Sequence, residues 1–192
     1  MRCLPLILAA ICSTACMQTV ELSRAIQPSR PLPDRSSEKI GVVCSENLLA
    51  HEERASHFEL ALGEPLCSAL IKSAEGTYRS AERVTQPYKG QYGRVVRFDL
   101  QSSVVDVQRR GDGSTRVSCS ISVVVERYGR DLQRLTSQAV IGNGFVERQD
   151  AADVIVREAV EAALQEVTDN ASSLLVAGLD GPRQHGSASE PR

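Results

Sequence analysis

The chain has few of the side chains that usually carry chemistry. Its 192 residues include no tryptophan, three phenylalanines, four tyrosines and three histidines. Few groups are therefore left for stacking, for ligating a metal or for moving protons near neutral pH. Acidic and basic residues almost balance, with a formal net charge of −2 and a sequence pI near 6.0, so no general basic field attracts nucleic acid. The composition favours a scaffold or binding module over an enzyme and predicts no nucleic-acid partner.

The apolar stretch at the amino terminus is too short to span a bilayer comfortably. It extends from Cys3 to Cys12, whereas a spanning helix needs roughly 20 residues. The stretch follows Arg2 and leads into small residues, which is typical of a secretory signal. We therefore expect residues 1–15 to be a signal peptide that is removed, with an uncleaved anchor as an alternative.

The end of this signal resembles the lipobox of bacterial lipoproteins, in which a cysteine is acylated and the chain is cut directly before it. The segment reads Ser13-Thr14-Ala15-Cys16. The resemblance implies a covalent lipid such as palmitate on Cys16, with no other cofactor, and stable membrane attachment through several acyl chains. Met17, rather than Asp, follows the cysteine, which implies export to the periplasmic face of the outer membrane. Ser13 replaces the usual Leu, Val or Ile, so ordinary cleavage after Ala15, giving a soluble periplasmic protein, is the alternative.

Two segments flank a single predicted domain. Residues 16–38 contain three prolines and no sustained period, which predicts a flexible tether between the lipid and the domain. Residues 178–192 have almost nothing to bury and predict a disordered tail. One domain is expected between them, over residues 39–177.

Residues 117–128 are the most regular part of the chain, because apolar and polar side chains alternate there. The apolar set consists of Val117, Cys119, Ile121, Val123 and Val125. A period of two predicts a half-buried strand. Residues 93–107 predict its partner strand, with one extra residue near Ser102-Ser103, a β-bulge that would restore a single apolar face. Residues 110–114 contain two glycines and predict the hairpin turn between the two strands.

A third strand, over residues 132–142, is predicted to complete an antiparallel meander. Leu135, Ala139 and Ile141 are expected on its inward face, and Gly142-Asn143-Gly144 is expected to end it. Shorter strands are predicted over residues 40–45, 58–62 and 78–84.

Two helices are predicted in addition. One begins at Gly63-Glu64-Pro65 and ends near Gly76, because proline suits the first turn of a helix. The other follows Asp150, which is expected to cap it, and its apolar stripe is expected to pack on the sheet. The predicted fold is therefore α+β: a mainly antiparallel sheet, formed by a three-strand meander and a short amino-terminal strand, with two helices on one face.

Candidate reactive residues are scattered. His51 and His57 lie beside glutamates, but a spacing of six places them on different helix faces, so we expect a solvated loop and no metal site. A soluble periplasmic enzyme would have to use dispersed polar residues such as His51, Glu52 and Asp99. No nucleophile, base and orienting group are recognisable together, so no catalytic residue is expected.

Three cysteines, Cys44, Cys67 and Cys119, remain for the domain. An odd number in an oxidising compartment allows one bonded pair and one free thiol. Cys44 and Cys119 each alternate in step with the apolar residues of their strands, so both are expected to face inward. A disulfide between them is possible, as is one between Cys67 and Cys119. Free buried thiols that act as small apolar residues are the other interpretation.

The order of these features resembles the YajG-type small lipoproteins of Gram-negative bacteria. The local match is S-Q-A-V-I-G-N-G-F-V-E-R-Q-D-A-A-D-V-I-V-R-E-A-V, residues 137–160. The layout is also similar to LptE-like lipopolysaccharide-assembly lipoproteins and to auxiliary lipoproteins of ABC transporters. The resemblance implies a non-enzymatic lipoprotein that binds an envelope protein or a lipid-like ligand in envelope assembly or transport. A subunit of an ABC transporter or secretion complex is one alternative, and a periplasmic enzyme is another. An open sheet face or an exposed strand edge is expected to receive the partner.

Overall fold

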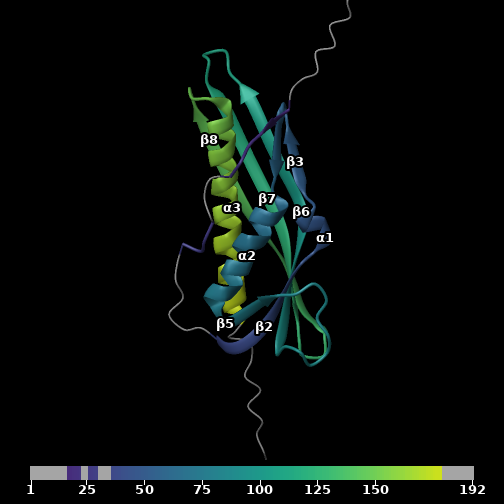
Figure 1. Cartoon of the computed structure of the whole chain (residues 1–192). Coiled ribbons are helices and arrows are strands. Elements are labelled where there is room, and N and C mark those ends of the chain that lie inside the picture. Colours follow the sequence, from purple (N-terminus) through teal and green to yellow (C-terminus); the bar gives the residue numbers. More distant parts are fainter. Residues whose placement is uncertain (1–16, 23–25, 30–35, 179–192) are drawn as a thin grey trace, which may run out of the picture.

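The computed structural model describes residues 17–22, 26–29 and 36–178, and these form two sheets and three helices. The larger sheet has the strand order β5-β2-β6-β7-β8, and the smaller has the order β1-β4-β3. Helices α2 and α3 lie side by side in front of the larger sheet (Figure 1). The elements are β1 (Gln18–Thr19), β2 (Ser36–Cys44), α1 (Glu46–Leu49), β3 (Glu52–Ala55), β4 (Phe58–Ala61), α2 (Gly63–Thr77), β5 (Tyr78–Arg83), β6 (Arg94–Arg109), β7 (Thr115–Tyr128), β8 (Arg134–Arg148) and α3 (Ala152–Ala177).

The three long strands confirm the predicted antiparallel meander. β7 pairs with β6 on one side and with β8 on the other, antiparallel in both cases. The register between β6 and β7 shifts between Leu100 and Ser102, which confirms a bulge in this part of the strand. The predicted turn is also present: Arg110 N donates to Ser114 O at 2.9 Å, and Gly113 has a φ of 85°, a conformation that glycine adopts without steric cost.

Strand β8 continues through the glycines that were predicted to end it. Gly142 pairs with Ile121 and Gly144 with Cys119. A β-carbon on Gly144 would lie 1.7 Å from the carbonyl oxygen of Ala159 in α3. The two glycines are therefore the positions at which the helix backbone lies almost directly on the strand.

The predicted inward face of β8 is wrong. Leu135 and Ile141 are 58% and 49% exposed, and Ala139 is exposed too, whereas Val140 is only 7% exposed. The even-numbered positions face α3, because only small residues fit beneath a helix that approaches so closely. The larger apolar side chains of β8 point to the opposite side of the sheet.

Strand β2 makes the large sheet mixed rather than mainly antiparallel. It lies between β5 and β6 and runs parallel to both. Helix α2 carries the chain from the β2 side of the fold to β5, which is the kind of connection that parallel strands require. The predicted bounds of this helix are confirmed within one residue, since it ends at Thr77.

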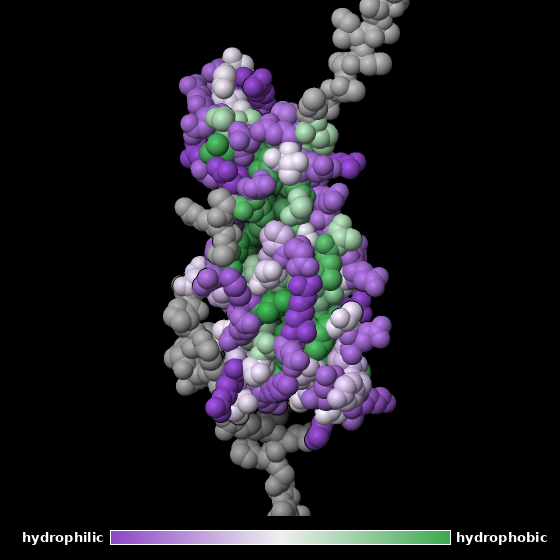
Figure 2. Space-filling model, in the orientation of Figure 1, coloured by the Kyte–Doolittle hydropathy of each residue, from purple (hydrophilic) through white to green (hydrophobic). Residues whose placement is uncertain are grey.

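Helix α3 begins without the predicted side-chain cap. Its N-cap residue is Ala151, which makes no capping hydrogen bond. Asp150 instead pairs with Arg148, with 2.5 Å between Oδ2 and Nε. The apolar stripe of α3 packs on β7 and β8 as expected. Figure 2 shows that hydrophilic side chains dominate the outer surface on this side of the molecule.

The described parts of the predicted tether pack on the domain. β1 pairs in parallel with β4, and Val20 and Ile26 are buried. Ser29 donates to Asp169 through both its backbone nitrogen and its hydroxyl, each at 2.7 Å. A free tether is therefore wrong for these residues. The predicted signal peptide, the acylation site at Cys16 and the carboxy-terminal tail from residue 179 onward lie outside the described residues.

Candidate functional site

The three residues proposed for an enzyme do not form a joint site. His51 Nε2 lies 2.7 Å from Ser103 Oγ, Asp99 Oδ1 accepts from Ser45 Oγ at 2.5 Å, and Glu52 is exposed at the start of β3. No hydrogen bond or ion pair joins any two of the three. Ser45 also caps α1 by accepting from Leu48 N, so Asp99 supports a helix cap.

His51 belongs to a half-buried polar cluster with Glu53 and Ser103. The Ser103 hydroxyl donates to Glu53 Oε2, and His51 Nε2 lies 3.4 Å from the same carboxylate oxygen. In a hydrolytic triad the serine and the acid contact different nitrogens of the imidazole. Here both are at Nε2, so the acid cannot orient the ring toward the serine. The cluster joins β3 to β6 instead of activating a nucleophile.

The sequence did not indicate β3, and the prediction of a solvated loop over residues 51–57 is wrong. β3 and β4 form an antiparallel hairpin connected by Ser56 and His57. Ser56 has a φ of 57°, a conformation in which glycine or asparagine is usual. The ordinary signal of a tight hairpin is therefore missing, and β3 has no alternating apolar residues that could have replaced it.

The cysteines pair differently from the predicted alternatives. Cys44 and Cys67 form a disulfide with 6.0 Å between their Cα atoms, and Cys119 is free and buried. Cys119 lies on β7, and β6 separates that strand from the β2 strand of Cys44. Cys67, on α2, is bonded to Cys44, so neither predicted bond to Cys119 forms. Burial raises the pKa of the Cys119 thiol to about 12. The thiol is therefore protonated at neutral pH and is a poor nucleophile.

The face of β6, β7 and β8 that points away from the helices is a candidate binding surface. We call it the open face. Its central strand contributes a row of small hydroxyl side chains, flanked by three large apolar ones: Val104 on β6 is 58% exposed, and Ile141 and Phe145 on β8 are 49% and 54% exposed. The residues that define it are Ser102, Val104, Asp106, Ser118, Ser120, Ser122, Ile141, Asn143 and Phe145.

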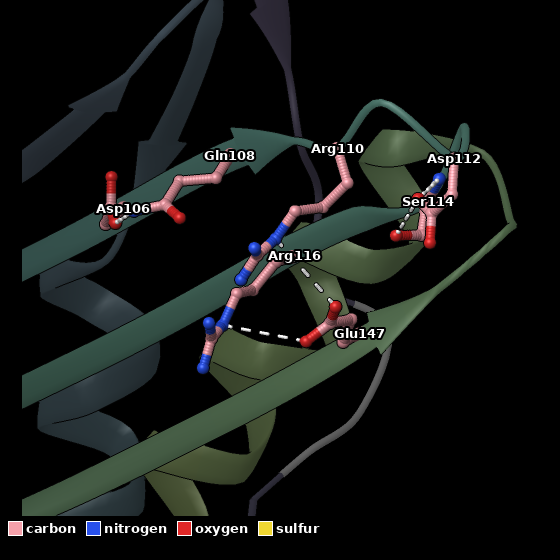
Figure 3. Close-up of polar contacts among 7 residues, drawn as sticks. All are labelled: Asp106, Gln108, Arg110, Asp112, Ser114, Arg116 and Glu147. Atoms are coloured by element: carbon pink, nitrogen blue, oxygen red, sulfur yellow. Dashed lines mark hydrogen bonds and ion pairs between the residues drawn. The ribbon is translucent and has the colours of Figure 1, made fainter.

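Charged residues surround one end of the open face, next to the β6–β7 turn (Figure 3). Arg116 and Arg110 both approach Glu147, with Nε to carboxylate distances of 3.6 and 3.9 Å. The Arg116 guanidinium also lies over the Phe145 ring, 5.0 Å from its centroid. Asp112 accepts from the hydroxyl and the backbone N–H of Ser114, and these hydrogen bonds lower its pKa. The arrangement is a polar rim beside an exposed aromatic ring, which is common at the edge of protein interfaces.

The middle of the β8 edge is protected by side chains of α3. Glu166 Oε2 accepts from the backbone nitrogen of Asn143 at 2.7 Å, and Asn170 Nδ2 donates to the carbonyl of Ile141 at 2.7 Å. These contacts satisfy backbone groups that another strand would need for pairing. A partner therefore meets fewer obstacles on the open face than along this edge.

A pocket of about 420 Å³ lies at the end of the sheet opposite the β6–β7 turn. Val95 and Arg97 of β6 and Tyr128 of β7 line it, together with Pro87 from the β5–β6 loop and Leu132 from the β7–β8 turn. Its volume lies within the range of about 300–1,000 Å³ that is usual for small-molecule sites. No pattern along the sequence indicated this pocket, because its walls come from segments distant in the chain.

No grouping of acidic, histidine and cysteine residues suited to a metal ion occurs among the described residues. Within the same ranges, no helix combines the length and apolar character that crossing a membrane requires.

Comparison with known proteins identifies the fold. No family model matches the sequence, and no curated protein sequence matches it. A Xanthomonas campestris protein of the DUF330 family superimposes with a TM-score of 0.60 at 13% identity, covering 84% of this chain and 97% of that one. A Caulobacter crescentus protein gives 0.47 at 14% identity, covering 74% and 90%. A minor lipoprotein of Acinetobacter baumannii gives 0.46 at 8% identity, covering 76% and 96%. The chain therefore shares its fold with the Xanthomonas protein, and at this identity the similarity concerns the fold alone.

Proposed function

We propose that this protein is a non-enzymatic lipoprotein of the bacterial cell envelope that binds a partner protein through the open face. The observation that carries the proposal is the open face itself. A sheet of three long strands has one side packed on the helices, while Val104, Ile141 and Phe145 are about half exposed on the other. Exposed apolar side chains that gather on one face mark interaction surfaces more often than isolated ones do.

The shape and chemistry of the open face suit a protein partner. Along their full length of 14 to 16 residues, three strands spaced about 4.8 Å apart, with roughly 3.4 Å per residue, present on the order of 700 Å². The nine residues that define the open face cover about a third of this area. One partner contributes about 800 Å² to an interface of standard size. Ser118 and Ser120 are exposed and have short side chains, so another backbone can approach the sheet closely there. Phe145 and Ile141 would then supply the buried apolar anchors, and Arg116 and Glu147 the rim.

The amino terminus supports attachment to a membrane through Cys16. The lipobox-like segment ends at Cys16, and β1 begins at Gln18. Gln18 N donates to His57 O at 2.8 Å and Val20 N to Glu59 O at 3.0 Å, so the chain is held on β4 almost directly after the proposed lipid. Acylation at Cys16 would therefore place the β3–β4 hairpin next to the membrane. The Cys44–Cys67 disulfide suits an oxidising compartment such as the periplasm.

The anchor is tested by the mass of the mature amino-terminal peptide from a membrane fraction. We expect a peptide that begins at acylated Cys16 and that disappears in a Cys16→Ala variant. An unmodified peptide that begins at the same residue would exclude the lipid anchor. It would leave the proposed docking on the open face to be tested separately.

Docking is tested by placing a photo-crosslinking amino acid at Ser120, in the centre of the open face. The matched control position is Glu75, which is exposed on α2. We expect one discrete adduct from position 120 in cells and none from position 75. An Ile141→Glu and Phe145→Glu double variant should abolish that adduct, whereas Tyr88→Glu, at an exposed residue outside the open face, should not. Equal labelling from positions 120 and 75 would contradict the proposal. The identity of the partner distinguishes an assembly factor from a transporter subunit.

A further inference from the structure

The pocket at the end of the sheet is separate from the residues that define the open face. Val95 and Arg97 of β6 and Tyr128 of β7 line it from the sheet, while Pro87 and Leu132 come from two different loops. Its volume of about 420 Å³ falls in the range of about 300–1,000 Å³ that is usual for small-molecule sites. At roughly 30 Å³ per non-hydrogen atom, the share of one molecule in liquid water, it would hold on the order of a dozen atoms.

The two loops that form the walls are fixed by backbone hydrogen bonds. Gly90 N in the β5–β6 loop donates to Arg130 O in the β7–β8 turn at 3.0 Å, and Leu132 N donates to Gly129 O at 2.9 Å. Leu132 has a φ of 58°, which is unfavourable for a residue with a β-carbon. Such conformations persist where the surroundings hold them, and they cluster at binding sites. The pocket is therefore largely preformed.

Arg97 places a positive charge on one wall of the pocket. Arg97 makes no hydrogen bond and no ion pair with any residue that the structure describes. The acid opposite it, Glu126 on β7, already accepts from Tyr128 OH at 2.7 Å and from Arg134 Nη1 at 3.1 Å. The guanidinium of Arg97 keeps its donors available, and its planar fork matches a carboxylate. Four of the lining residues are apolar, namely Val43, Pro87, Val95 and Leu132, while Thr85, Gln86 and Tyr128 add uncharged polar groups.

We infer that this pocket binds a small amphipathic carboxylate, with the carboxylate on Arg97 and a short alkyl chain against Val95, Pro87 and Leu132. Charge complementarity selects the anionic end, and the volume limits the chain to about the length of octanoate. This inference goes beyond the proposed function, because it requires neither the lipid anchor nor the docking partner. The β5–β6 loop and the β7–β8 turn, which line the pocket, lie toward the opposite end of the molecule from β3, the strand in the same small sheet as β1 (Figure 1). A chain anchored at Cys16 would therefore hold the pocket away from its own membrane.

The test is a titration of octanoate into the mature Cys16→Ala chain, which needs no detergent, followed by nuclear magnetic resonance of the backbone amides. We expect saturable shifts centred on residues 86, 97, 128 and 132. Octanol and octylamine should bind at least tenfold more weakly than octanoate, because neither offers an anion to Arg97. Acetate should also bind at least tenfold more weakly, because it lacks the alkyl chain.

Variants decide whether Arg97 holds the ligand. Arg97→Gln should weaken octanoate binding at least tenfold, and Arg97→Lys should weaken it less, because the charge remains. Arg109→Gln is the matched control, at an exposed arginine on the other end of the same strand, and should bind like the parent chain. Retained thermal midpoints would show that the variants fold. Equal affinity for octanol and octanoate, unchanged binding by Arg97→Gln, or no saturable shift would each overturn the inference. None of these readouts involves the partner, so failure here is distinct from failure of docking.

Discussion

The close approach of α3 to β8 predicts that Gly144→Ala is strongly destabilising. The new β-carbon would lie 1.7 Å from Ala159 O, 2.8 Å from Ala159 C and 2.9 Å from Ala163 N. All three are backbone atoms of α3, so no side-chain rotation relieves the clash. The helix and the strand must move apart by more than about 1 Å, which loosens the packing of the whole buried stripe of α3. Overpacking of this kind costs about 1–3 kcal/mol and occasionally more.

We expect a loss of about 3 kcal/mol in the free energy of unfolding, at the upper end of that range, because a backbone cannot yield as a side chain can. Urea unfolding followed by far-ultraviolet circular dichroism measures it. Gly142→Ala should lower the free energy of unfolding by a similar amount, since its β-carbon would lie 2.1 Å from Ala163 O. Gly111→Ala is the control, because nothing lies within 4 Å of that position, and it should change the free energy by less than about 0.5 kcal/mol. If Gly144→Ala unfolds at the same urea concentration as the parent chain, α3 does not rest on β8 as described.

Three further predictions follow from the cysteines and the sheet edge. Cys67→Ser should lower the free energy of unfolding by about 3 kcal/mol in urea, because the Cys44–Cys67 bond closes a loop with a sequence separation of 23 in the unfolded chain. The raised pKa of Cys119, about 12 against an ordinary value of 9.0, makes stability pH-dependent, because the thiol ionises more readily in the unfolded chain. Its contribution is complete below pH 9.0 and falls by up to about 1.4 kcal/mol per pH unit as the pH rises toward 12; Cys119→Ala should remove that part of the decline in urea midpoints. A Glu166→Ala and Asn170→Ala double variant loses the side chains that bond to the backbone of β8 at Asn143 and Ile141. It should expose the β8 edge and increase self-association in sedimentation velocity, whereas Glu75→Ala on α2 should not.

The sequence was most informative where one face of a strand is buried. The alternation around Cys119 and Ile121 fixed the position of β7, because a slip of one residue would turn every apolar side chain to solvent. The change of parity between Leu100 and Val105 indicated the bulge for the same reason. Pro65 located the start of α2, because the position has no need of a backbone N–H. In each case the signal is local to the chain.

The errors arise where distant segments decide the outcome. Gly142 and Gly144 were interpreted as turn residues, but a helix that follows later in the chain requires them to lack side chains. Ile141 was expected in the core because it is large and apolar, although it lies on the open face. The Cys44–Cys67 bond depends on α2 packing beside β2, and the pocket at Arg97 depends on two loops meeting. Neither arrangement has a pattern along the sequence.

The position of β2 also constrains the order in which the protein can fold. β2 occupies the space between β5 and β6, which are consecutive in the chain but not neighbours in the sheet. Its apolar side chains, among them Ile40 and Val42, are therefore covered on one edge only after β6, a strand much later in the chain, has been synthesised. Pairings between such distant segments slow folding, because a long loop must close first. Cys44 and Cys67 both precede β6, so their bond can form before β6 pairs and can hold β2 against α2 until then.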